Sequence, residues 1–101
     1  MHTKTQRGET MVTAIILMNV KRAEINATAE KLAETNGISE VYSVSGNYDL
    51  VAVARIKTND DLADLVTNKL HAIDEILKTE SMLAFKAYSR HDLEAMFSLG
   101  G

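Results

Sequence analysis

ISEVYSVSGNYDLVAVARIK, residues 38–57, is the stretch that decides the fold of this 101-residue chain. β-branched and aromatic residues recur in its two halves, Ile38 to Ser45 and Tyr48 to Lys57, and such residues favour strands. Gly46 and Asn47 lie between the halves and tolerate the positive φ that tight hairpin turns require. The stretch therefore predicts two strands joined at Gly46-Asn47.

The residues before this hairpin predict a strand followed by a helix. Met11 to Val20 is an apolar, β-branched run that is too short for a buried helix. In Arg22 to Asn36 the apolar residues recur at helical spacing, and Gly37 follows where a left-handed residue commonly ends a helix. The predicted buried face of this helix consists of Ile25, Ala29, Leu32 and Ala33.

The residues after the hairpin predict a second helix and a last strand. Thr58 is a favourable N-cap, with Asp61 in the first turn. The last strand is expected over Lys78 to Ser89. The resulting order, β-α-β-β-α-β, predicts an α+β domain of the ferredoxin-like type over about 11–91, with two helices on one face of a four-stranded antiparallel sheet. The apolar stripe of the second helix comprises Leu62, Leu65, Val66, Leu70 and Ile73.

Both ends of the chain fall outside this pattern. Residues 1–10 are expected to form a disordered or loosely attached lead without the apolar run of a secretory signal. Residues 92–101 are expected to form a short amphipathic tail, with Leu93, Met96 and Phe97 on one side. No stretch reaches the roughly 18 apolar residues of a membrane span. We therefore expect a cytoplasmic protein without a membrane partner.

The predicted strands are apolar on both faces. The side chains of Val51 and Val53 point to the opposite face from those of their neighbours in the strand, and Ile15 and Leu17 do the same in the first strand. Two helices, however, cover only one face of the sheet. Leaving such side chains in water forgoes roughly 1.5–3 kcal/mol each. We therefore expect the second face to pack on another copy, giving a homodimer of the dimeric α/β barrel type. The alternative is that the tail folds back over this face.

Composition and motifs argue against several classes of protein. The net charge is -3, and the sequence has no cluster of basic residues, so direct nucleic-acid binding is not expected. The chain has no cysteine, and it lacks the spacings of a zinc site, a dinucleotide site or a P-loop. We therefore expect no metal, no cofactor and no catalytic residues.

Ser45 to Asp49 is the one unusual polar segment. One interpretation is turn chemistry, in which Asp49 caps a backbone amide, and the other is a ligand loop. In a ligand loop the turn amides would receive a carboxylate, Asp49 an ammonium group, and Tyr48 would wall the pocket. The residues alone leave both interpretations open.

With its flanking residues this segment resembles a known family. VYSVSGNYDLVAVARI, residues 41–56, preceded by ISEV and a helix, resembles the effector domain of the Lrp/AsnC regulators, in which V-x-G-x-Y/F-D-hydrophobic recurs at the second hairpin. The remainder, NDDLADLVTNKLHAIDEILKTESMLAFKAYS, is also similar, and the tail resembles small free-standing members. The resemblance covers about residues 11–99.

The resemblance implies an amino-acid-binding and assembly module linked to transcriptional regulation. It implies dimers that assemble into tetramers, octamers or larger rings, with the amino acid effector in a crevice between dimers. Full-length Lrp/AsnC regulators are candidate partners. The implied ligand-binding residues are Gly46, Asn47, Tyr48, Asp49, His71, Met82, Leu83 and Ala84. For Leu83 a role in the core is equally compatible.

Two departures from the family pattern bear on function. Full-length regulators carry an N-terminal helix-turn-helix, whereas ten residues precede the first predicted strand here, so we expect no operator binding by that route. Many relatives have Pro-Gly-Val before the last strand, where this chain has Ile73-Asp74-Glu75-Ile76. This difference leaves the size of the pocket and the effector open.

Two other functions remain as alternatives. One is a small dimeric enzyme such as a monooxygenase, whose polar groups would be Tyr42, Tyr48, Tyr88 and His91. The other is an assembly scaffold that binds no ligand.

Overall fold

The computed structural model describes residues 11–88 and residue 90. The predicted lead, the tail with its apolar side, and His91 lie outside the described residues. Within them the strands are β1 (Val12–Val20), β2 (Ile38–Ser43), β3 (Leu50–Ile56) and β4 (Ile76–Leu83). The helical segments are a 3₁₀ turn η1 (Arg22–Glu24), α2 (Ile25–Ala33), α3 (Asn59–Asp64) and a π-helical segment η2 (Leu65–Leu70).

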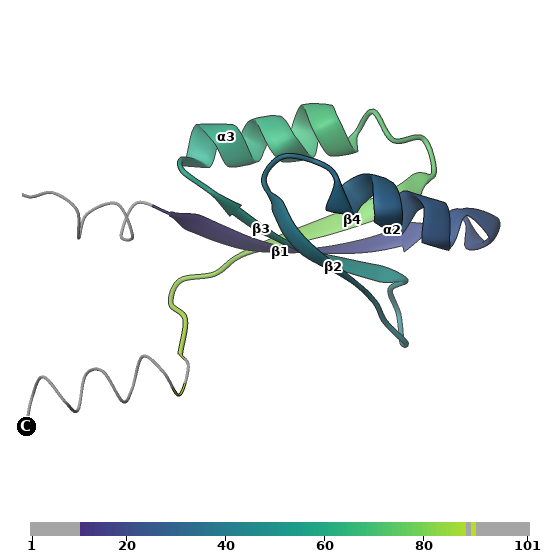
Figure 1. Ribbon diagram of the computed structural model, residues 1–101, viewed down its shortest axis with the longest axis horizontal. Coiled ribbons are helices and arrows are strands. Elements are labelled where there is room, and N and C mark those ends of the chain that lie inside the picture. Colours follow the sequence, from purple (N-terminus) through teal and green to yellow (C-terminus); the bar gives the residue numbers. More distant parts are fainter. Residues whose placement is uncertain (1–10, 89, 91–101) are drawn as a thin grey trace, which may run out of the picture.

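The four strands form one antiparallel sheet in the order β2-β3-β1-β4. Both helices lie on the same side of this sheet (Figure 1). This arrangement confirms the predicted βαββαβ order and the ferredoxin-like class. Because β2 and β4 are the edge strands, the apolar residues of β1 and β3 occupy the centre of both faces.

The core lies between the helices and the inner face of the sheet. Ala14, Ile16 and Met18 of β1 are fully buried there, beside Leu50, Ala52 and Ala54 of β3. Their partners across the layer are Leu32 of α2 and Leu65 and Leu70 of η2. This alternation in β1 and β3 confirms the predicted division of each strand between two faces.

The first helical region is shorter than predicted. The predicted span from Arg22 to Asn36 opens with a 3₁₀ turn, and the α-helix ends at Ala33. The prediction that Ala33 faces the core is wrong, because Ala33 is exposed and Thr28 is buried instead. Gly37 has the expected positive φ of 99°, and its carbonyl accepts a hydrogen bond from Arg55 N at 2.9 Å. A Cβ at Gly37 would lie 3.4 Å from Ile56 Cγ2, so this turn passes close to β3.

The second helix begins where the sequence predicts and then changes pitch. The Asp61 amide donates to Thr58 Oγ1 at 3.0 Å, which confirms the predicted N-cap. From Leu65 to Leu70 the helix is a π-helix, in which bonds link residues five apart. Leu65 and Leu70 are five apart and both buried, so the wider turn directs both toward the sheet.

The strand limits correct two further predictions. The hairpin is not a tight Gly46-Asn47 turn, because β2 ends at Ser43 and β3 begins at Leu50. The last strand runs over Ile76–Leu83, so it starts two residues earlier and ends six residues earlier than expected. The apolar residues beyond Leu83 favour a strand by composition, but this segment extends away from the sheet (Figure 1).

Candidate ligand-binding loop and far sheet face

The β2–β3 loop, residues 44–49, is fixed to the end of β1 by hydrogen bonds. The Asp49 carboxylate oxygen Oδ2 accepts from Val20 N at 2.9 Å, and Asp49 N donates to Met18 O at 2.9 Å. Asn19 Nδ2 donates to Asn47 O at 2.9 Å. Val44 N closes the loop on Asp49 O at 3.1 Å. The loop is longer than a two-residue turn because Asp49 pairs with β1 before β3 begins.

Gly46 supplies the conformation that this loop needs. Its φ is 107°, in the region that residues with a side chain rarely adopt. No heavy atom lies within 4 Å of the position of an added Cβ, so the constraint at Gly46 is the backbone dihedral and not crowding.

Tyr48 connects the loop to the opposite edge of the sheet. Its hydroxyl donates to Glu80 Oε1 of β4. This hydrogen bond raises the pKa of Tyr48. Leu17 of β1 pairs with Glu80 and shares its sheet face, so the Tyr48 side chain reaches over the far face of the sheet.

A depression of about 480 Å³ lies beside the loop, at the point where β1 leads into the first helical region. It is lined by Val20, Arg22, Ile25 and Asp49. The depression thus combines two apolar side chains with one guanidinium and one carboxylate. These opposite charges match the two charged groups of a free amino acid.

His71 lies at the same end of the sheet as the loop, on the helix side. It follows the π-helix and lines a depression of about 320 Å³ with the start of β4, from Ile76 to Thr79. Thr79 pairs with Met18, whose carbonyl receives the Asp49 amide. His71 and the loop therefore approach the same end of β1 from different sides.

Met82, Leu83 and Ala84 lie at the other end of the sheet. Leu83 pairs with Ala14, and Ala84 N donates to Thr13 O at 2.9 Å. Met82 and Leu83 also line an apolar groove of about 360 Å³ between β4 and α3. Thus one subunit brings Gly46, Asn47, Tyr48 and Asp49 together, with His71 nearby, and leaves residues 82–84 at a distance.

The far face of the sheet, opposite the helices, has an apolar centre, and three of the four ends of its cross-strand rows are polar. Two cross-strand rows define it: Glu40–Val53–Ile15–Met82 and Tyr42–Val51–Leu17–Glu80. The four central residues of β1 and β3 are partly exposed in the single chain, and Met82 is 44% exposed. An apolar centre with a polar rim is the usual composition of a protein interface.

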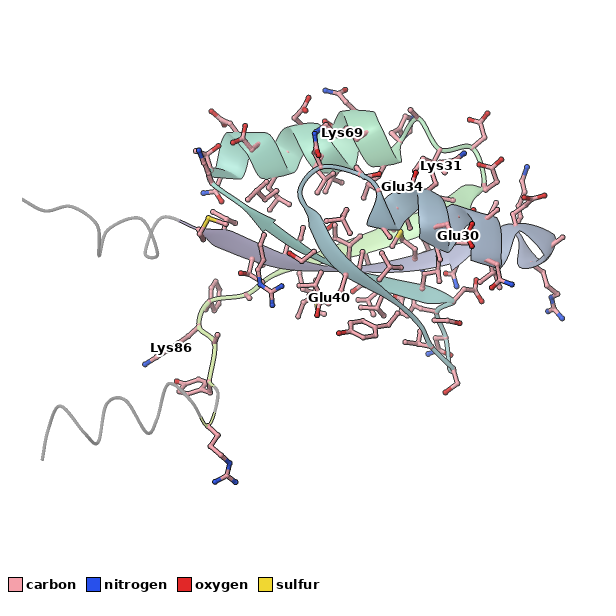
Figure 2. All side chains as sticks on the ribbon, viewed as in Figure 1. Glu30, Lys31, Glu34, Glu40, Lys69 and Lys86 are labelled. Carbon is pink, nitrogen blue, oxygen red and sulfur yellow. The ribbon has the colours of Figure 1, made fainter. Side chains whose placement is uncertain are left out.

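The polar edge on the β2 side is a hydrogen-bonded cluster. Glu40 Oε1 accepts from Arg55 Nη1 at 2.9 Å, and Glu40 Oε2 accepts from the Tyr42 hydroxyl at 2.8 Å. The Tyr42 hydrogen bond and then the Arg55 guanidinium lower the pKa of Glu40, and the same hydrogen bond raises the pKa of Tyr42. Figure 2 shows Glu40 on the side of the sheet away from the helices.

Sequence reasoning missed two features of this region. The helical periodicity places Arg22 at the start of a helix and does not mark it as a site residue, although a basic residue shortly after a strand end could have drawn attention to it. The Glu40–Arg55 pair was also missed, because it joins residues 15 apart and depends on strand register.

In the described part of the chain, no group of three His, Cys, Asp or Glu side chains could hold a metal ion. None of the described helices is long and apolar enough to cross a membrane.

Comparison with known proteins agrees with this architecture. Residues 13–93 match the model of the Lrp/AsnC ligand binding domain. The HTH-type transcriptional regulator LrpA of Pyrococcus abyssi is 35% identical over 71 residues, which are 70% of this chain and 50% of that protein. This chain therefore aligns with about half the length of that curated relative.

Two solved structures match over nearly their whole length. The Thermus thermophilus protein TTHA0845 is 40% identical with a TM-score of 0.73, covering 78% of this chain and 99% of that one. The Pyrococcus horikoshii protein PHS023 is 34% identical with a TM-score of 0.71, covering 79% and 96%. Together with the family match over most of the chain, these likenesses settle its classification. The chain belongs to the Lrp/AsnC ligand binding domain family.

Proposed function

We propose that this domain binds an amino acid beside the loop of residues 44–49, in a crevice completed by a second subunit, and that binding shifts its assembly. The observation that carries the proposal is that Arg22 and Asp49 line the same depression. The guanidinium suits the α-carboxylate of an amino acid, and the Asp49 carboxylate suits its ammonium group. Val20 and Ile25 supply apolar surface for a side chain.

The depression is open on one side, which supports a shared site. A small ligand is normally enclosed over most of its surface, and the four described lining residues leave this depression open. A subunit packed on the far face would touch Tyr48 of the same loop, and a crevice between two such dimers would supply the second wall of the depression. A ligand held between subunits binds the assembly better than its parts and therefore shifts the association equilibrium.

The connection to transcription is part of the same proposal. The relative from Pyrococcus abyssi is named as an HTH-type transcriptional regulator, and this chain aligns with about half of its length. A domain that pairs through its far face could pair with the corresponding domain of a full-length regulator. Its amino acid response would then act on transcription through that partner.

Calorimetric titration with each of the twenty amino acids tests the binding claim. We expect heat from one amino acid or a small group, and loss of that heat in Arg22→Gln and Asp49→Asn. Lys57→Gln is the matched control, because Lys57 is an exposed basic residue outside the depression. Silence from all twenty, in a protein that still self-associates, would favour a scaffold without a ligand.

A further inference from the structure

The segment that follows β4, residues 84–88, carries two aromatic side chains into solvent. The Phe85 side chain is 96% exposed and Tyr88 is 73% exposed. The Ala84 amide still donates to Thr13 O at 2.9 Å, so the segment is tied to the sheet only at its start among its described backbone contacts. Lys86 Nζ lies 5.1 Å from the centre of the Tyr88 ring, a contact within the segment itself. We call residues 84–88 the C-terminal arm.

The arm leaves the domain on the side of the far face. In Figure 1 both helices lie above the sheet, and the arm, in yellow-green, descends below it. Figure 2 shows Lys86 of the arm well away from the helix layer, on the same side of the sheet as Glu40. The arm therefore enters the space that a subunit packed on the far face would occupy.

Leaving these two rings in water is energetically unfavourable, and this chain contains few aromatic residues. The whole chain has five aromatic residues, and two of them lie on the arm. Burial of a phenyl ring such as that of Phe85 is favourable because it removes apolar surface from water. Aromatic side chains are also enriched at interfaces, where a few of them carry much of the binding energy. A role for Phe85 in association accounts for its position better than a role inside its own subunit.

The length of the arm fits a contact with a second copy. Five extended residues span about 16 Å, and two sheets packed face to face lie about 10 Å apart. The arm can therefore pass the gap between the paired sheets and reach the edge of the second one. A twofold axis repeats the contact, so each subunit would be held by the arm of the other.

We propose that residues 84–88 are an exchange arm that places Phe85 against a second copy of this chain, at the margin of the paired far faces. The inference rests on the subunit pairing in the proposed function and adds the residues that clamp it. Because each subunit contributes one arm, a substitution in the arm weakens two contacts in each dimer.

A single-tryptophan variant, Phe85→Trp, tests the arm directly, since the chain has no tryptophan of its own. In the dimer we expect blue-shifted emission and protection from acrylamide. In a second protein that adds Ile15→Lys on the far face, or on dilution of Phe85→Trp below the dimer dissociation constant, we expect the emission of a water-exposed indole. We also expect Phe85→Ala to weaken dimerisation about tenfold, because it removes the aromatic ring that makes the contact in each half of the dimer. The matched control is Leu77→Ala, because Leu77 is 63% exposed and lies outside the arm.

The outcomes separate the arm from the pairing itself. An exposed indole in a protein of dimeric mass would overturn the arm and leave the pairing intact. A buried indole in the monomeric form would also overturn it, since the arm would then fold back on its own subunit. A wild-type protein that is monomeric at every concentration tested would overturn the pairing and the arm together.

Discussion

Asp49 holds the N–H group of Val20, 29 residues earlier in the chain, at 2.9 Å between Oδ2 and N. The bond joins the β2–β3 loop to the end of β1, where the chain turns into the first helical region. The same carboxylate lines the depression beside Arg22. Asp49 therefore fixes the loop, and the same carboxylate borders the proposed ligand site.

Substitution of Asp49 separates these roles. Asp49→Ala leaves the part-buried Val20 N–H without its acceptor, and we expect a loss of about 1–3 kcal/mol in the free energy of unfolding. Asp49→Asn keeps a side-chain oxygen acceptor, so we expect most of that stability to remain, while affinity for an ammonium group falls. Urea denaturation measures the first effect and calorimetry the second. Equal stability of Asp49→Ala and wild type would contradict the assigned hydrogen bond.

A charge at the centre of the far face should prevent association. Ile15 lies between Val53 and Met82 on that face and is partly exposed in the single chain. Ile15→Lys leaves the inner core untouched, so we expect a folded subunit of monomeric mass, because an unpaired charge is strongly disfavoured in an apolar interface. Light scattering gives the mass and circular dichroism the fold. Leu77→Lys, on an exposed residue outside the paired rows, should keep the wild-type mass.

The Glu40 cluster predicts a pH effect with a defined sign. The hydrogen bonds from Tyr42 and Arg55 lower the pKa of Glu40 in the folded protein. The stabilisation is therefore fully present above the pKa of the unfolded chain, near 4.5, and is lost as the pH falls through the lower folded value. We expect the urea midpoint of Glu40→Gln to change less than that of wild type between neutral pH and about pH 3. If the urea midpoints of the two proteins fall by the same amount as the pH is lowered, this assignment is wrong.

Thr58 provides a test of the helix start. Its hydroxyl oxygen accepts from the Asp61 amide at 3.0 Å, and Thr58→Ala should lower the free energy of unfolding by about 1 kcal/mol. Thr58→Ser keeps the hydroxyl, so we expect it to restore most of the loss. If the serine variant is as unstable as the alanine variant, the effect arises from lost packing of the methyl group and not from the cap.

The features that follow from short-range pattern were predictable. The alternation in β1 and β3, the stripe on α2 and the cap at Thr58 depend on residues a few positions apart, and the structure has each of them except for Ala33 of the stripe, which is exposed. The features that depend on tertiary contacts were not. The Val20–Asp49 hydrogen bond lengthens the loop beyond a Gly46-Asn47 turn, and no local pattern records it.

Element ends differ from prediction for similar physical reasons. The apolar spacing of the second helix fits an α-helical period. In the structure, however, Leu65 and Leu70 are both buried by a π-helical turn. The strand-like residues after Leu83 suggest a longer β4, but the chain leaves the sheet after the Ala84 amide bonds to β1. For the proposed site, the loop residues were suggested by the sequence and remain a prediction, whereas Arg22 was added from the spatial arrangement.

The most direct test of the account is the mass of the wild-type protein in solution, measured by light scattering at low micromolar concentration. The chain has a mass of 11.1 kDa, and the exposed apolar centre of the far face predicts twice that value or a higher even multiple. A single species of 11.1 kDa would contradict the account, because the crevice proposed for the amino acid would then have no second wall.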